Sequence, residues 1–179
     1  MNIIDTQLVG VKIIEPKIWR DERGFFMETF REDWFRTHIA DCQLVQHNHS
    51  CSQQNVLRGL HFQWEKPQAK LIRVVSGSVL DVAVDLRQDS PTFGQWISIV
   101  LSAENARQLW LPEGFAHGFY AQENHTQLIY QCSDYYHPES ERILLWSDPT
   151  LAIDWQLHGT PIISEKDKQG KTWQEIEKF

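Results

Sequence analysis

Ser78-Val79-Leu80-Asp81-Val82-Ala83-Val84-Asp85-Leu86 is the stretch that decides the fold of this chain. Every second residue from Leu80 to Leu86 is aliphatic, whereas Asp81 and Asp85 fall on the opposite side of an extended chain. This alternation has the period of two residues that a β-strand imposes on its side chains. The stretch therefore predicts a strand that turns one aliphatic face toward a core.

Short runs of the same kind recur on both sides of this stretch. They are Val11–Glu15, Lys70–Val75, Gln95–Leu101, Arg107–Leu111, Phe115–Tyr120, Thr126–Cys132 and Arg142–Trp146. Turn-forming residues such as Asp89-Ser90-Pro91 separate them. Strands at this spacing predict an all-β sandwich or barrel. Only Glu32–Ile39 and a C-terminal stretch, from about Ser164 into Thr172–Glu177, favour short helices.

Length and composition narrow the class of protein. With 179 residues, 41% of them hydrophobic, the chain fits one domain over residues 1–179. Its 17 basic and 24 acidic residues give a net charge of −7, which argues against a nucleic-acid partner. No stretch approaches the ~18 apolar residues of a membrane-spanning helix, and the N-terminus lacks a signal-peptide pattern. Three cysteines without a Cys-x-x-Cys pair favour a reducing cytoplasm, so we expect a cytoplasmic protein without a membrane partner.

Two segments carry histidines that can meet in one site. Leu57–Gln63 contains His61, and Pro112–Gly118 contains His117 about fifty residues later. Residues two apart in a strand share a side, so His61 and Gln63 should face one way. We expect His117 to meet them across a barrel.

Arg58 precedes His61 by three residues, so an unbroken strand would turn the two side chains to opposite sides. Both can serve one ligand only if the strand begins after Arg58 or bulges at Gly59. The sequence therefore predicts a local break at this glycine.

The two histidine segments resemble the two motifs of the cupin jelly roll. Further segments, in order and across nearly the whole chain, resemble the dTDP-4-dehydrorhamnose 3,5-epimerase family. The matching segments are Asp21–Phe26, Gln46–Ser50, Leu57–Gln63, Asp81–Asp85, Ser90–Gly94, Pro112–Phe119 and Ser164–Asp167. The resemblance implies a cofactor-free cupin jelly-roll barrel or sandwich that forms a homodimer. It also implies epimerisation of a dTDP-4-keto-6-deoxyhexose, dTDP-4-dehydro-6-deoxy-D-glucose, at C3 and C5, giving dTDP-4-dehydro-L-rhamnose in dTDP-L-rhamnose biosynthesis.

Epimerisation beside a ketone needs a base, an acid on the opposite face and positive charge near the carbonyl oxygen. Imidazole titrates near pH ~6.5, so a histidine suits the role of base. The resemblance implies that His61 is this base and that Asp167 is its carboxylate partner. It implies that Lys70 supplies the positive charge and that Tyr130 donates the proton. We expect Lys70 to turn inward beside Asp85.

Each of these residues also has an ordinary structural interpretation. Ser164-Glu165-Lys166-Asp167 has the spacing of a helix capping box, in which Asp167 serves only as a cap. Lys70 lies at the start of an apolar strand, where a lysine is often on the surface. A tyrosine such as Tyr130 in a barrel strand is often a packing residue.

The remaining matched positions imply a binding site for the nucleotide sugar. They are Arg23, Glu28, Gln46, Asn48, Arg58, Asp85, His117, Tyr136, Glu141 and Lys166. The resemblance makes Tyr136 the ring expected to stack on thymine. Arg58 suits the diphosphate, because a guanidinium donates two parallel hydrogen bonds.

We expect neither a metal nor another cofactor. Many cupins hold a metal through three histidines and a glutamate, but Gln63 replaces the second histidine of the first motif. No glutamate follows at a ligand-like spacing before the Lys70 strand, and two histidines with an amide make a poor transition-metal site. Three alternatives stay open: a C3-only epimerase of a dTDP-4-keto-deoxysugar, a non-catalytic nucleotide-sugar-binding cupin and a metal-dependent oxygenase. Gln63 argues against the oxygenase.

Overall fold

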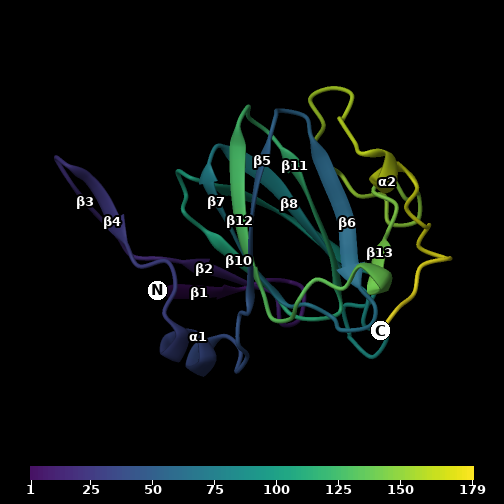
Figure 1. Cartoon of the computed structure of the whole chain (residues 1–179), viewed down its shortest axis with the longest axis horizontal. Coiled ribbons are helices and arrows are strands. Elements are labelled where there is room, and N and C mark those ends of the chain that lie inside the picture. Colours follow the sequence, from purple (N-terminus) through teal and green to yellow (C-terminus); the bar gives the residue numbers. More distant parts are fainter.

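A computed structural model describes residues 1–179 as two antiparallel β-sheets that face each other (Figure 1). The six-stranded sheet has the order β1 (Asn2–Asp5), β2 (Lys12–Glu15), β10 (Gln108–Leu111), β7 (Lys70–Ser76), β12 (Thr126–Cys132) and β5 (Gln46–Ser52). The five-stranded sheet has the order β13 (Glu141–Ile143), β6 (Leu57–Gln63), β11 (Phe115–Ala121), β8 (Ser78–Asp85) and β9 (Trp96–Ser102). The prediction of an all-β sandwich is confirmed.

The other elements lie outside the two sheets. They are the hairpin β3 (Ile18–Asp21) and β4 (Gly24–Met27), the helices α1 (Glu32–His38) and α2 (Glu165–Lys168), and the 3₁₀ turn η1 (Pro138–Ser140). The hairpin projects from the sandwich (Figure 1). None of the helices has the length and apolar character needed to cross a membrane.

The space between the sheets is filled by apolar side chains from both. Ile72, Val74 and Leu128 of the six-stranded sheet pack with Ala83 and Phe119 of the five-stranded sheet. Burying each large aliphatic or aromatic side chain contributes about 1.5–3 kcal/mol relative to leaving it exposed. This interior cluster holds the sheets together, and the strand ends around it are free to carry polar groups.

The strand β8 is buried at every position because it has a core on each face. Val79 and Ala83 point into the interior cluster, whereas Leu80, Val82 and Val84 belong to a second cluster on the outer face. The C-terminal segment covers that outer face with Leu151, Trp155 and Ile176, among others. The aliphatic face predicted from the sequence is therefore packed under the C-terminal segment.

The predicted C-terminal helix is only partly right. The helix α2 ends at Lys168, and Thr172–Glu177 forms turns. Lys171 instead exchanges backbone hydrogen bonds with the end of β13, donating to Ile143 and accepting from Leu145. Gly170 allows this close approach, since a Cβ there would lie 2.8 Å from the Cα of Leu145. Backbone pairing with the sheet has replaced the helix.

Candidate active site

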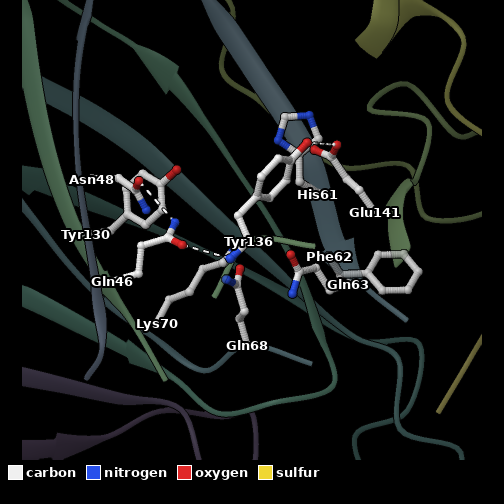
Figure 2. Close-up of a pocket in the computed structure, with 10 residues that line it drawn as sticks. All are labelled: Gln46, Asn48, His61, Phe62, Gln63, Gln68, Lys70, Tyr130, Tyr136 and Glu141. Carbon is white, nitrogen blue, oxygen red and sulfur yellow. Dashed lines mark hydrogen bonds between the residues drawn. The ribbon is translucent and has the colours of Figure 1, made fainter. Parts of the chain in front are cut away.

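A pocket opens between the two sheets at one end of the sandwich (Figure 2). It is lined by Gln46, Asn48, His61, Phe62, Gln63, Gln68, Lys70, Tyr130, Tyr136 and Glu141. The strands β5, β7 and β12 supply one wall, and β6 with β13 supplies the opposite wall. Most of these side chains are polar, and they come from segments that are far apart in the sequence.

A bulge in β6 turns Arg58 and His61 to the same side. Arg58 pairs with Phe119 and His61 pairs with His117, so two residues of β6 stand against Gly118 alone. The extra residue lets side chains three apart in β6 match side chains two apart in β11. Gly59 has φ +117°, and a Cβ there would lie 2.6 Å from the Cα of Gly118. The predicted break at this glycine is confirmed.

The same pairing corrects the expected position of His117. It lies beside His61 on the neighbouring strand of one sheet, and not across a barrel from it. After about fifty residues the chain comes back to the same sheet, where β11 pairs with β6. They are therefore cross-strand neighbours.

His61 and Asp167 form a hydrogen-bonded pair. His61 Nε2 lies 2.6 Å from Asp167 Oδ1, and the backbone amide of Gly59 donates to Oδ2 at 3.2 Å. Burial alone would raise the pKa of Asp167, but the hydrogen bonds from His61 and Gly59 outweigh it and hold this pKa below its usual value. An ionised carboxylate only accepts, so Nε2 carries the proton and Nδ1 keeps the free lone pair.

Part of the capping interpretation also holds. Ser164 is the N-cap of α2, and its hydroxyl accepts from the backbone amide of Asp167 at 3.1 Å. The backbone of Asp167 thus completes the cap while its carboxylate bonds His61. The two interpretations concern different atoms of one residue.

Lys70 and Tyr130 line the pocket wall opposite His61 (Figure 2). Lys70 shares its side of β7 with the interior residues Ile72 and Val74, and its Nζ lies 5.9 Å from the centre of the Tyr130 ring. Burial lowers the pKa of Lys70 and raises the pKa of Tyr130. These two groups lie on a different sheet from His61, across the pocket.

The carboxylates whose charges act on Lys70 are Asp81 and Glu141, and the expectation of Asp85 is wrong. Asp85 accepts hydrogen bonds from Arg87, Ser90 and Thr92, which hold the turn after β8. Asp81 is fully buried, and both of its carboxylate oxygens lie 2.9 Å from His117 Nε2.

Asp81 was not among the predicted site residues, although the alternation in β8 places it on the same face as Asp85. Its charge opposes the effect of burial on the pKa of Lys70. Asp81 thus contributes both to the surroundings of that lysine and to the orientation of His117.

A second polar group lies around Tyr136 at the mouth of the pocket. The Tyr136 amide donates to Gln46 Oε1 at 2.7 Å, and its hydroxyl donates to Glu141 Oε2 at 2.8 Å. Lys166 forms an ion pair with Glu141, and Asn48 accepts from Gln46 at 3.2 Å. The structure therefore brings together five of the residues predicted to bind substrate.

Arg58 borders the pocket region from its bulge, where its Nε donates to the hydroxyl of Ser52 at 3.1 Å. It also lines an adjoining groove with His61 and Lys166. The position of Arg58 agrees with the prediction that it shares a ligand with His61.

Arg23 and Glu28 are not brought to this pocket. Arg23 lies in the turn of the β3–β4 hairpin with a side chain that is 87% exposed, and it pairs there with Asp21. Glu28 follows β4 and lies near Arg31. Within one chain, these two predicted substrate-binding residues are separate from the others.

No group of three or more histidine, cysteine, aspartate and glutamate side chains is arranged to hold a metal ion. The Gln63 amide, which replaces a cupin metal ligand, is hydrogen-bonded to backbone groups of two loops. The polar lining is thus organised by carboxylates, amides and single imidazoles.

Comparison with known proteins places this cupin-type sandwich among the isomerase-class enzymes. The sequence model of dTDP-4-dehydrorhamnose 3,5-epimerase matches residues 5–175, and the chain belongs to that family.

Two curated relatives are dTDP-4-dehydrorhamnose 3,5-epimerases. The protein of Neisseria gonorrhoeae is 55% identical over 99% of this chain, which spans only 54% of that longer protein. The protein of Methanothermobacter thermautotrophicus is 50% identical, with 97% of this chain and 95% of the relative covered.

A solved structure has a similar level of sequence identity to this chain. It is the dTDP-6-deoxy-D-glucose-3,5-epimerase of Legionella pneumophila in complex with dTDP-4-keto-L-rhamnose. It is 51% identical, has a TM-score of 0.96 and covers 98% of this chain and 94% of its own.

Proposed function

We propose that this protein converts dTDP-4-dehydro-6-deoxy-D-glucose to dTDP-4-dehydro-L-rhamnose by inverting C3 and C5, as a step of dTDP-L-rhamnose biosynthesis. The observation that carries the proposal is the His61–Asp167 pair on one wall of a pocket whose other wall holds Lys70 and Tyr130. Membership of the epimerase family and the likeness to an epimerase solved with dTDP-4-keto-L-rhamnose support it.

The chemistry follows from the acidity of a hydrogen beside a ketone. The free Nδ1 of His61 removes the proton from C3 or C5, and Asp167 stabilises the imidazolium that forms. The electron pair moves to the C4 oxygen, where the Lys70 cation stabilises the enolate. Tyr130 returns a proton to carbon from the opposite face, because it comes from the opposite sheet. The carbon is inverted and the ketone is restored.

The groups at the pocket mouth suit the nucleotide part of the substrate. Tyr136 offers a half-exposed ring for the thymine base, and Arg58 and Lys166 offer cations for the diphosphate. Gln46, Asn48 and Glu141 hold these groups or contact the nucleotide themselves. The chain as a whole carries a net charge of −7, but these two cations provide local positive charge for an anionic ligand.

The product configuration tests the proposal. Purified protein incubated with dTDP-4-dehydro-6-deoxy-D-glucose, with excess chelator present, should give a product whose NMR couplings report inversion at both C3 and C5. Inversion at C3 alone would make the protein a C3-only epimerase. Unchanged substrate would favour the non-catalytic binding protein, and activity that requires an added transition metal would contradict the acid–base mechanism.

Asp167→Asn should lower the turnover number about 10²-fold or more while the protein stays folded. The amide can still accept from the Gly59 amide, but it does not stabilise an imidazolium as a carboxylate does. Steady-state kinetics and thermal unfolding check the two parts of this expectation. A folded Asp167→Asn protein with full activity would leave Asp167 with a capping role only.

Activity should fall at alkaline pH with a midpoint below 10.5, the ordinary lysine pKa. Burial lowers the pKa of Lys70, so the required cation is lost at a lower pH than in an exposed lysine. Asp81→Asn should move this alkaline limb to still lower pH, because it removes a negative charge that raises the Lys70 pKa.

The measurement for this prediction is the pH dependence of kcat. Glu104→Gln is the matched control, since Glu104 is exposed in the turn between β9 and β10. An alkaline limb that does not move in the Asp81→Asn protein would contradict the proposed environment of Lys70.

A homodimer is also part of the proposal. The β3–β4 hairpin exposes Phe25 and Phe26 by 60% and 69%, together with Trp19, which is unfavourable unless another surface covers them. Arg23 and Glu28 lie on or beside this hairpin, far from their expected ligand in the same chain. We infer that the hairpin of one protomer reaches the pocket of its partner. A cytoplasmic location, favoured by three unpaired cysteines, completes the proposal.

Mixing two inactive variants tests the exchange of hairpins. An Arg23→Ala protein and a His61→Ala protein, allowed to exchange subunits, should form mixed dimers in which one pocket has both residues intact. Activity of the mixture should then exceed that of either variant alone. No gain, with subunit exchange verified by mass spectrometry, would show that Arg23 acts within its own chain or has no role.

A further inference from the structure

The Gln63 side chain is buried and uses its amide on both sides of Tyr136. Its Oε1 accepts from the backbone amide of His137 at 2.7 Å, and its Nε2 donates to the carbonyl of Tyr135 at 3.3 Å. Nε2 also donates to the carbonyl of Lys66 at 2.7 Å. Gln63 is only 5% exposed, so water does not replace these bonds readily.

These contacts fix the backbone of a segment whose side-chain anchor is the hydrogen bond from the Tyr136 hydroxyl to Glu141. Tyr135 and Tyr136 are exposed by 65% and 50%, and they lie between β12 and η1 without regular secondary structure. Gln63 bonds the residue before Tyr136 and the residue after it. Gln46 accepts from the amide of Tyr136 itself at 2.7 Å. Two glutamine side chains therefore hold backbone groups of three consecutive residues.

We propose that Gln63 is a positioning residue that fixes the ring of Tyr136 for the nucleotide base. This inference rests on the proposed function. An amide suits this task because it donates and accepts at one position. A carboxylate at residue 63 would face two carbonyl oxygens, and an aliphatic side chain would satisfy none of the three groups. Gln63 thus stands where other cupins have a metal ligand, and here it orders the loop that carries Tyr136.

The test is a double-mutant cycle on the affinity for dTDP, measured by calorimetry without turnover. Gln63→Met should raise the Kd about tenfold in the otherwise unchanged protein, and should raise KM while changing kcat less than twofold. In a Tyr136→Ala background the same substitution should have no further effect on the Kd, because the ring that it positions is absent. Gln131→Met is the matched control, since Gln131 lies partly buried on the outer face of β12 and its side chain bonds only His47.

Gln63→Glu gives a second and independent readout. At neutral pH it should bind dTDP as weakly as Gln63→Met, and its affinity relative to the unchanged protein should recover as falling pH protonates the new carboxyl. That recovery decides the case if Gln63→Met does not fold. An unchanged Kd, or equal weakening with and without Tyr136, would overturn the inference. Failure of the unchanged protein to bind dTDP would instead count against the proposed function.

Discussion

The His61→Ala protein should lose both solvent-deuterium exchange and inversion, with a fall in turnover of about 10²- to 10⁴-fold. Both events require removal of the same proton. No other imidazole in the pocket is paired with a carboxylate of α2. Rates of deuterium uptake from D₂O, followed by mass spectrometry, measure this loss without depending on the final product.

His61→Gln separates chemistry from packing. Its side-chain amide can still donate to Asp167, so it keeps the partner of that buried carboxylate, but it has no basic nitrogen. We expect this variant to be as inactive as His61→Ala and to bind dTDP with nearly unchanged affinity. An active His61→Gln protein would mean that His61 serves only to hold Asp167 in place.

Tyr130→Phe should retain deuterium exchange and lose most of the inversion. Proton removal depends on His61 and Lys70, and the imidazolium can return a deuteron to the face from which it took the proton. Inversion needs an acid on the other wall, where the substitution removes only a hydroxyl and keeps the ring against Lys70. The product analysis therefore compares the deuterium content of recovered substrate with the amount of inverted sugar.

Near-normal inversion by the Tyr130→Phe protein would contradict this role. Water or another side chain would then deliver the proton, and Tyr130 would belong to the packing of the pocket wall. The matched control is Tyr135→Phe, because Tyr135 is exposed and is not one of the residues that line the pocket.

The bulge at Gly59 shows what could be predicted from the sequence about this site. The requirement that Arg58 and His61 share a ligand conflicts with their spacing of three, and only a local irregularity resolves the conflict. The structure has this irregularity at the predicted glycine. The inward positions of Lys70 and Tyr130 were expected from the family resemblance, because their own strands were also compatible with a surface lysine and a packing tyrosine.

Contacts set by strand register were not predictable in the same way. Asp81 and Asp85 both have the interior parity, but four residues of strand separate them by about 13 Å. Which of the two lies near Lys70 depends on the register of β8 with β11 and on how their sheet faces β7, and the local sequence specifies neither. The prediction of a helix over Thr172–Glu177 was wrong for a related reason, since the pairing of Lys171 with the end of β13 is a long-range contact.

The positions of Arg23 and Glu28 depend on how the whole β3–β4 hairpin is oriented relative to the sandwich. Nothing in the sequence between β3 and α1 says whether the hairpin folds back on its own pocket or extends outward. Exposed aromatic side chains on the hairpin are the structural evidence for the second arrangement. Under the dimer proposal, the hairpin of the partner brings Arg23 and Glu28 to the nucleotide site.

Deuterium incorporation into the inverted product in D₂O is the most direct test of the central claim that this protein epimerises two carbons through enolates. The unchanged protein, incubated with dTDP-4-dehydro-6-deoxy-D-glucose, should give a product with deuterium at both C3 and C5 and with inversion at both. NMR locates the deuterons, and mass spectrometry counts them. Inversion without solvent deuterium at either carbon would contradict the enolate mechanism, and the absence of both exchange and inversion would contradict the proposed activity.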